Sequence, residues 1–146
     1  TMIITRTPFR VTLGGGGTDL PSYYSKYGGF IFSFAINKYM FIYLNRPVID
    51  DLIRIKYSKS ETVNDINEVE HDIARACMEH TNFVNGIEIT SMADIPAGSG
   101  LGSSSTYTVG LLNALHAMKR DYNSLKNLAE EAIRSVCEYQ KKDGSC

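Results

Sequence analysis

The sequence has neither an excess of basic residues nor a long uninterrupted apolar run. Fifteen Lys and Arg residues stand against sixteen Asp and Glu residues, which leaves a formal net charge of -1. Non-specific binding to nucleic acid requires clustered positive charge, so this balance argues against a nucleic-acid partner. No stretch approaches the length of a membrane-spanning helix, and the N-terminus shows no signal-peptide pattern. We therefore expect a cytoplasmic protein with no membrane partner.

Cysteine is also scarce. Cys77, Cys137 and Cys146 form an odd, scattered set without the spacing of metal ligands, which favours reduced thiols. The remaining composition, 43% hydrophobic and 21% charged over 146 residues, is typical of one globular domain with its own core.

Apolar patterning predicts strands mainly in the first half of the chain and helices in the second half. The expected strands lie within 2–13 (one strand, or two broken near Pro8), 30–46 (two strands with Asn37 and Lys38 in a turn), 52–58 and 86–93. A short helical turn is expected near Asp19 and Pro21, and helices within 66–80, 103–118 and 122–142, the last with Asn123 as its N-cap. This arrangement predicts an α+β domain.

The densest local pattern is GSGLGSSS, Gly98 to Ser105, which runs directly into the apolar helix. Glycines let backbone N–H groups turn toward an anion, and a helix N-terminus carries a partial positive charge. Serine hydroxyls beside them suit a magnesium ion carried by phosphates. The terminal Gly-Lys-Ser/Thr of the common P-loop is absent, and a flexible loop with a serine N-cap is the alternative interpretation.

A second glycine-rich stretch, PFRVTLGGGGTD, ends at Asp19. Its four glycines permit close approach by a ligand or a tight turn. The carboxylate of Asp19 is suited to accept hydrogen bonds from sugar hydroxyls, and equally to cap the following turn. The guanidinium of Arg10 is suited to bind a phosphate or a carboxylate, or simply to be solvated. Taken together, the two stretches supply what phosphoryl transfer needs: a phosphate cradle, an acid and an arginine.

These two stretches, in this order, resemble the first and second signature motifs of the GHMP kinases. The longer string RTPFRVTLGGGGTDLPSYYSKYGG, followed by AINKY, is most similar to the heptose 7-phosphate kinase branch, and the match extends to about Glu131. The resemblance implies a fold like the second domain of ribosomal protein S5, with a left-handed βαβ crossover. It also implies ATP-dependent phosphorylation of the anomeric hydroxyl of D-glycero-D-manno-heptose 7-phosphate, a step toward surface polysaccharide.

The resemblance also implies roles for individual residues. Ser104 corresponds to the magnesium ligand, Arg10 to an arginine near the transferred phosphoryl group, and Lys38 to a contact for the substrate's own phosphate. Tyr57 and Ser58 are candidates for the adenine pocket. The sugar pocket would be lined by Gly16, Gly17, Thr18 and Asp19, and the ATP phosphates would be wrapped by Pro96, Ala97, Gly98, Ser99, Gly100, Leu101, Gly102, Ser103, Ser104 and Ser105.

The chain departs from the family pattern near its end. Heptose kinases carry a Gly-Lys-Gln-Asp-type segment whose aspartate is the expected general base, whereas this chain has KKDGSC and matches it loosely through Asp143. We expect residues 1–146 to be the N-terminal domain of a two-domain enzyme, inactive alone. An exposed face at Val136, Cys137 and Tyr139 would then favour self-association.

The sequence leaves two alternative functions open: another GHMP sugar kinase such as a fucokinase, or a non-catalytic nucleotide-binding module. An RNA-binding domain is disfavoured by the charge.

Overall fold

A single five-stranded sheet forms the base of the fold in the computed structural model, which describes residues 1–142, with side chains through residue 135. The strands are β1 (Met2–Gly14), β2 (Phe32–Asn45), β3 (Ile53–Lys56), β4 (Ser60–Val63) and β5 (Ile87–Ala93). Their order across the sheet is β1-β2-β5-β3-β4, and all neighbours are antiparallel except β3 and β5. The connection from β3 to its parallel neighbour β5 runs through a helix.

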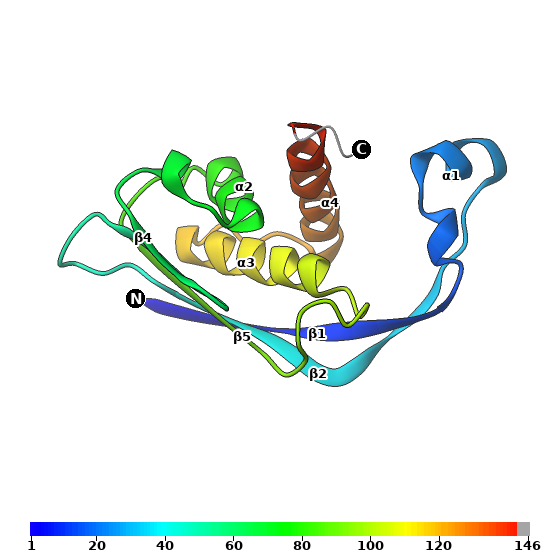
Figure 1. The fold of residues 1–146 in the computed structure, drawn as a ribbon, viewed down its shortest axis with the longest axis horizontal. Coiled ribbons are helices and arrows are strands. Elements are labelled where there is room, and N and C mark those ends of the chain that lie inside the picture. Colours follow the sequence, from blue (N-terminus) through cyan, green and yellow to red (C-terminus); the bar gives the residue numbers. More distant parts are fainter. Residues whose placement is uncertain (143–146) are drawn as a thin grey trace.

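Three helices cover one face of this sheet (Figure 1). They are α2 (Asp72–His80), α3 (Ser103–Lys119) and α4 (Leu125–Lys142); a short 3-10 helix, η2 (Ile66–Glu68), precedes α2. Fully buried Ile42, Leu44 and Ile89 from the sheet belong to the same core as Leu111 and Leu115 of α3. The mixed sheet with helices on one face confirms the predicted α+β class.

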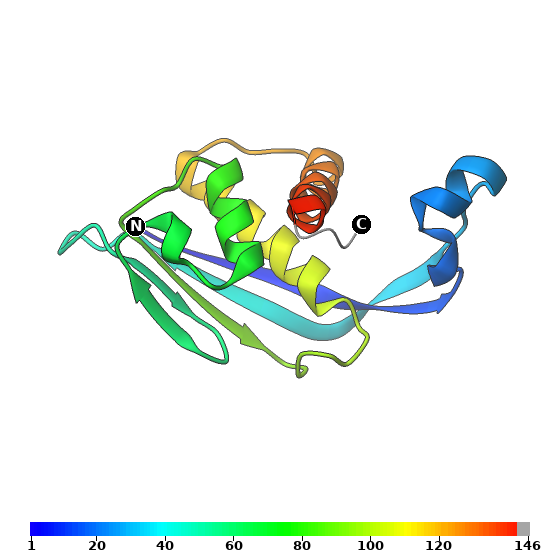
Figure 2. The ribbon, with the colours of Figure 1, turned by 45° about the horizontal axis from the view of Figure 1, so that its top comes forward.

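The outer ends of β1 and β2 continue past the helices as a two-stranded arm (Figures 1 and 2). The arm carries η1 (Gly16–Thr18) and α1 (Pro21–Tyr27) at its tip, apart from the other helices. A β-carbon on Gly15, whose φ is +84°, would lie 1.8 Å from the carbonyl oxygen of Phe30. Glycine is therefore required where the chain turns at the tip of the arm.

Close contact between α3 and the sheet depends on Gly110. The Thr5 hydroxyl donates a hydrogen bond of 2.9 Å to the Gly110 carbonyl. A β-carbon on Gly110 would lie 2.9 Å from Oγ1 of Thr7 and 3.3 Å from a side-chain carbon of Ile42. The absence of a side chain lets α3 settle against β1 and β2, which fixes where its N-terminus lies.

The structure corrects several expectations about the strands. Residues 32–45 form one continuous strand, so the turn expected at Asn37 and Lys38 is wrong: β2 runs on past them, and its pairing with β1 shifts register between Ala35 and Tyr39 instead of the chain folding back. Pro8 does not divide β1, because β1 is an edge strand that tolerates a missing N–H; the register shifts between Pro8 and Arg10. The strand β4 was not foreseen.

The helices correspond more closely to the prediction. The region 66–80 divides into η2 and α2. In front of α4, the Ser124 hydroxyl accepts a 3.1 Å hydrogen bond from the backbone N–H of Asn127, so Ser124 takes the capping position expected for Asn123. The described part of the chain does not include the side chains of Val136, Cys137 and Tyr139, and it does not include Asp143 or Cys146 at all.

Candidate functional site

The loop from β5 to α3 has the backbone conformation that its glycines suggested. Gly98, Gly100 and Gly102 have φ angles of +81°, +75° and +77°, in the left-handed region where a β-carbon is strained. Most of the loop, including Pro96, Ala97 and Ser99, is exposed to solvent, while Leu101 packs against the core. Ile95, near the start of the loop, packs against the core as well, so the loop is anchored near both ends and exposes its backbone between them.

The N-terminus of α3 is uncapped. Gly102 occupies the N-cap position, and no side chain in the described part of the chain donates or accepts a cap hydrogen bond there, although three serines follow. The Gly102 carbonyl accepts hydrogen bonds from the backbone N–H and the hydroxyl of Thr106, at 2.9 and 2.8 Å. The N–H groups of the first helical turn have no acceptor within the helix itself. They and the exposed hydroxyls of Ser104 and Ser105 form a site suited to an anion.

Arg10 brings the first motif to this helix terminus. A β-carbon built on Gly102 would lie 3.4 Å from both Cζ and Nε of Arg10. The guanidinium is oriented by a 2.6 Å hydrogen bond from Nη1 to the hydroxyl of Thr12, on the same strand. A fixed positive charge therefore stands beside the uncapped N–H groups, which strengthens the attraction for an anion.

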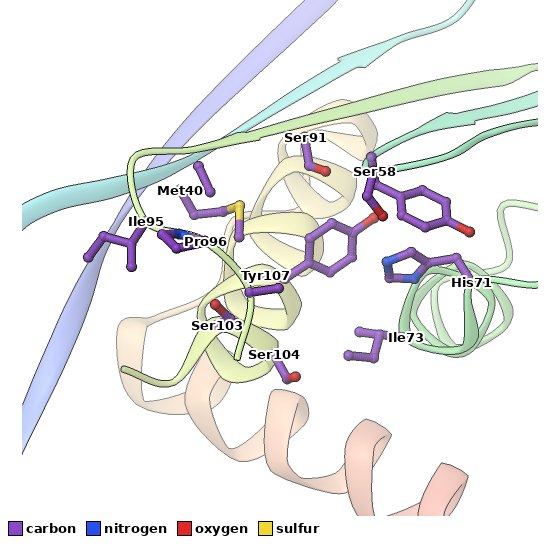
Figure 3. A pocket seen from close by; sticks show the side chains of 13 residues that line it. Met40, Ser58, His71, Ile73, Ser91, Ile95, Pro96, Ser103, Ser104 and Tyr107 are labelled. Carbon is purple, nitrogen blue, oxygen red and sulfur yellow. The ribbon is translucent and has the colours of Figure 1, made fainter. Parts of the chain in front are cut away.

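A pocket of about 390 Å³ opens beside the same helix terminus (Figure 3). We call it the α3 pocket. It combines side chains from the sheet, the loop, α2 and α3, and its lining consists of Met40, Tyr57, Ser58, His71, Ile73, Ser91, Ala93, Ile95, Pro96, Ala97, Ser103, Ser104 and Tyr107. Tyr57 and Ser58, the candidates for an adenine pocket, thus share one pocket with Ser103 and Ser104 of the glycine-serine motif.

Three aromatic rings form one wall of the α3 pocket. His71 stacks on Tyr107, with ring centroids 4.8 Å apart, and meets Tyr57 edge to face at 4.5 Å. Nδ1 of His71 also accepts the backbone N–H of Ala74 at 3.2 Å, which caps α2. Burial lowers the pKa of His71 below its ordinary value, against the opposing charge of Glu61. The ring is therefore neutral near pH 7.

His71 and Tyr107 were not identified from the sequence as part of a pocket. Ser103 and Tyr107 are four residues apart on α3, so their shared face was accessible from helical spacing alone. No local signal places His71 there, because α2 and α3 are separated by the whole of β5 and its loop.

A second pocket, of about 490 Å³, lies on the arm and is lined by Thr18, Asp19, Tyr24, Gly29 and Ile31. We call it the arm pocket. The Thr18 hydroxyl lies 2.7 Å from the carbonyl oxygen of Gly15 and 3.0 Å from that of Phe30, and it accepts a 3.1 Å hydrogen bond from the Phe30 N–H. Thr18 therefore holds the tip of the arm together, while the carboxylate of Asp19 is exposed at its surface.

The other candidates are exposed. Gly16 and Gly17 lie in η1, and described atoms come no closer than 3.8 Å to a β-carbon built on Gly16. Lys38 is exposed on β2. The arm pocket and the α3 pocket share no lining residue, so the structure groups Arg10 with the glycine-serine loop and Asp19 with the tip of the arm.

Within residues 1–142, no helix is long and apolar enough to cross a membrane. The same part of the chain contains no group of three or more His, Cys, Asp or Glu side chains arranged to hold a metal ion.

Comparison with known proteins gives consistent matches. Residues 52–146 match the profile of the GHMP kinases N terminal domain. A D-glycero-alpha-D-manno-heptose 7-phosphate kinase from Campylobacter jejuni is 32% identical over 123 residues, which cover 77% of this chain and 36% of that protein. A galactokinase from Chloroflexus aggregans is 26% identical over 153 residues, covering 91% of this chain and 37% of that protein.

Solved structures share the fold. A D-glycero-D-manno-heptose 1-phosphate kinase from Bacteroides thetaiotaomicron superimposes with a TM-score of 0.79 at 25% identity, over 98% of this chain and 49% of that one. A mevalonate kinase from Methanococcus jannaschii gives a TM-score of 0.77 at 22% identity, over 97% and 48% of the two chains. The chain therefore spans about a third of the curated relatives' length and about half of these solved chains. The likeness confirms the predicted fold of these N-terminal domains; the left-handed crossover stays a prediction.

Proposed function

Because the chain belongs to the GHMP kinases, through their N-terminal domain, we propose that it is the nucleotide-binding part of an ATP-dependent sugar-phosphate kinase. The proposed reaction transfers the γ-phosphoryl group of ATP to the anomeric hydroxyl of D-glycero-D-manno-heptose 7-phosphate and yields the 1,7-bisphosphate. The heptose 7-phosphate kinase among the relatives supports this substrate, the heptose 1-phosphate kinase supports a phosphorylated heptose, and the galactokinases support a sugar kinase more broadly.

The observation that carries the proposal is the uncapped start of α3 behind three left-handed glycines. Gly98, Gly100 and Gly102 allow the loop to turn its N–H groups outward, and the first turn of α3 adds more donors. The triphosphate of ATP would lie along Pro96 to Ser105. The Arg10 guanidinium, against Gly102, would neutralise charge that moves to the transferred phosphoryl oxygens.

Magnesium would enter this site together with the nucleotide. The exposed hydroxyl of Ser104, at the start of α3, is the protein ligand that we propose for it. A hydroxyl plus phosphate oxygens fits Mg²⁺, which keeps several waters and needs few protein ligands. When bound, the ion would neutralise the β- and γ-phosphates; the chain's own contribution is to orient the phosphates through Ser104 and the loop.

The nucleoside would occupy the α3 pocket. This pocket begins at Ser103 and Ser104, where the phosphates would lie, and continues to Tyr57 and Ser58. Its aromatic and apolar lining suits a flat base.

The sugar phosphate would bind on the arm. Asp19 offers an exposed carboxylate for sugar hydroxyls in the arm pocket, next to the open backbone of Gly16 and Gly17. The Thr18 hydroxyl is already committed to the backbone of Phe30, so Thr18 would contribute its main chain and shape. Lys38 on β2 is the candidate for the phosphate that the substrate already carries.

The proposal is tested by incubating the whole protein with ATP and heptose 7-phosphate and following the phosphorylated product by ³¹P NMR. We expect a new anomeric phosphate, and we expect Arg10→Gln to lower kcat by about a hundredfold to a thousandfold. The matched control is Arg6→Gln, on the same strand, where the guanidinium stacks on Tyr39 at 4.7 Å. Transfer to another sugar would reassign the substrate, and equal rates for both variants would remove Arg10 from the reaction.

A further inference from the structure

Tyr107 carries a buried hydroxyl that the fold leaves without a partner. The residue is only 5% exposed, and among the side chains described through residue 135 nothing pairs with its hydroxyl. A buried hydroxyl without a hydrogen bond destabilises the folded protein, and native structures rarely keep one without a reason. Phenylalanine would fill the same volume without this cost, so the hydroxyl calls for a functional explanation.

The position of Tyr107 points to a ligand in the α3 pocket. Its ring stands in the wall of that pocket, one helical turn after Ser103, with His71 beside it (Figure 3). The aromatic faces of Tyr107, His71 and Tyr57 meet here, whereas the hydroxyls of Ser103 and Ser104 lie at the helix terminus. A ligand with its anionic end at the serines would therefore place a flat ring against this wall.

The protonation states of Tyr107 and His71 determine which hydrogen bonds this wall can form with such a ring. Burial raises the pKa of Tyr107 well above its ordinary value, so the phenol keeps its proton and donates. The neutral ring of His71 accepts the N–H of Ala74 at Nδ1, so its own proton is on Nε2. Both groups can donate a hydrogen bond, so an acceptor on the ligand complements them.

We propose, resting on the function proposed above, that the Tyr107 hydroxyl donates a hydrogen bond to an acceptor atom of the nucleobase. Tyr107 is then a specificity-determining residue for the nucleotide. The ring nitrogens of a purine are acceptors of the required kind. The ribose and the phosphates are less suited to this wall, because its surface consists largely of aromatic rings.

The test compares Tyr107→Phe with the unaltered protein by isothermal titration calorimetry in magnesium. Three probes separate the parts of the nucleotide: ATP, ribose 5-triphosphate without a base, and inorganic tripolyphosphate. We expect the Kd for ATP to rise about tenfold in the variant, the loss of one hydrogen bond, with the other two affinities unchanged. Tyr122→Phe is the matched control, since Tyr122 is 79% exposed between α3 and α4 and should bind all three as before.

Thermal unfolding without ligand shows whether the variant is folded, and we expect its Tm to be equal or higher because an unpaired hydroxyl has been removed. An unchanged Kd for ATP would overturn the inference. An equal weakening of ribose 5-triphosphate or tripolyphosphate would also overturn it, by placing the contact on the ribose or the phosphates. If the unaltered protein bound neither ATP nor tripolyphosphate, the proposed function itself would fail, and the inference with it.

Discussion

The guanidinium of Arg10 lies against Gly102, so close that a β-carbon on the glycine would be 3.4 Å from Cζ of the arginine. Arg10 belongs to the first glycine-rich motif and Gly102 to the second. The contact joins β1 to the start of α3, because α3 packs tightly on β1 through Gly110. Two motifs that are far apart in the sequence thus meet at the start of α3, where we propose that the anion binds.

Gly102→Ala should destabilise the loop. At φ +77° an alanine is strained by about 1–2 kcal/mol, and its methyl group would lie in contact with the guanidinium of Arg10. We expect urea unfolding to show a loss of stability of about that size, and calorimetry to show weaker binding of Mg-ATP. The control for stability is Gly17→Ala, where a β-carbon meets no described atom within 4 Å. Equal stability of the two variants would contradict this account of the loop.

Asp19→Asn should act on the sugar alone. The carboxylate is exposed in the arm pocket, so its loss should leave the unfolding free energy within about 0.5 kcal/mol. The KM for the sugar phosphate should rise about tenfold, since a charged acceptor for hydroxyls is removed. The KM for ATP should stay the same, because the arm pocket shares no residue with the α3 pocket. A parallel rise in both KM values would count against separate sites.

His71 should make the stability depend on pH. Burial lowers the pKa of the folded-state imidazole below 6.5, so the unfolded chain takes up the proton first as the pH falls. The folded protein should therefore lose stability as the pH falls from about 6.5 to the lowered pKa of His71. Above about pH 6.5, His71 should make no contribution to the pH dependence. His71→Asn keeps a good N-cap for Ala74 but does not titrate. Urea unfolding from pH 7.5 to 5 should show a shallower decline in this variant; parallel curves would exclude His71.

Glu131 holds α4 to the other two helices. Its carboxylate lies 2.9 Å from Nε2 of His80 on α2 and 2.8 Å from Nε2 of His116 on α3, with 14% of its side chain exposed. Glu131→Gln removes the charge that both imidazoles face, so we expect a loss of about 1–2 kcal/mol in unfolding free energy. The adjacent Glu130→Gln, on an exposed residue, should change stability little. If the two variants were equally stable, this cluster would not anchor α4.

The sequence predicted the backbone of the glycine-serine loop and the helix after it well, because their signal is local. A side chain at positive φ is strained, so the alternating glycines predict the left-handed conformations that Gly98, Gly100 and Gly102 adopt. The long strand β2 was not predictable in this way: Asn37 and Lys38 are typical of turns, yet β2 pairs with β1 on both sides of them and continues as one strand across the register shift. The aromatic wall was also hidden, because His71, Tyr57 and Tyr107 come from three separate elements and meet only through tertiary packing.

The measurement that tests the central claim most directly is a thermal-shift titration with Mg-ATP, with Ser104→Ala and Ser60→Ala compared with the unaltered protein. Ser104 is exposed at the uncapped start of α3, whereas Ser60 is exposed on β4. A ligand that binds only the folded state raises Tm, and at a given ligand concentration the rise is larger for tighter binding. We predict a magnesium-dependent rise for the unaltered protein and Ser60→Ala, and a much smaller one for Ser104→Ala with equal stability in the absence of ATP. Equal rises in all three proteins, or none in any, would contradict a phosphate cradle at this helix terminus.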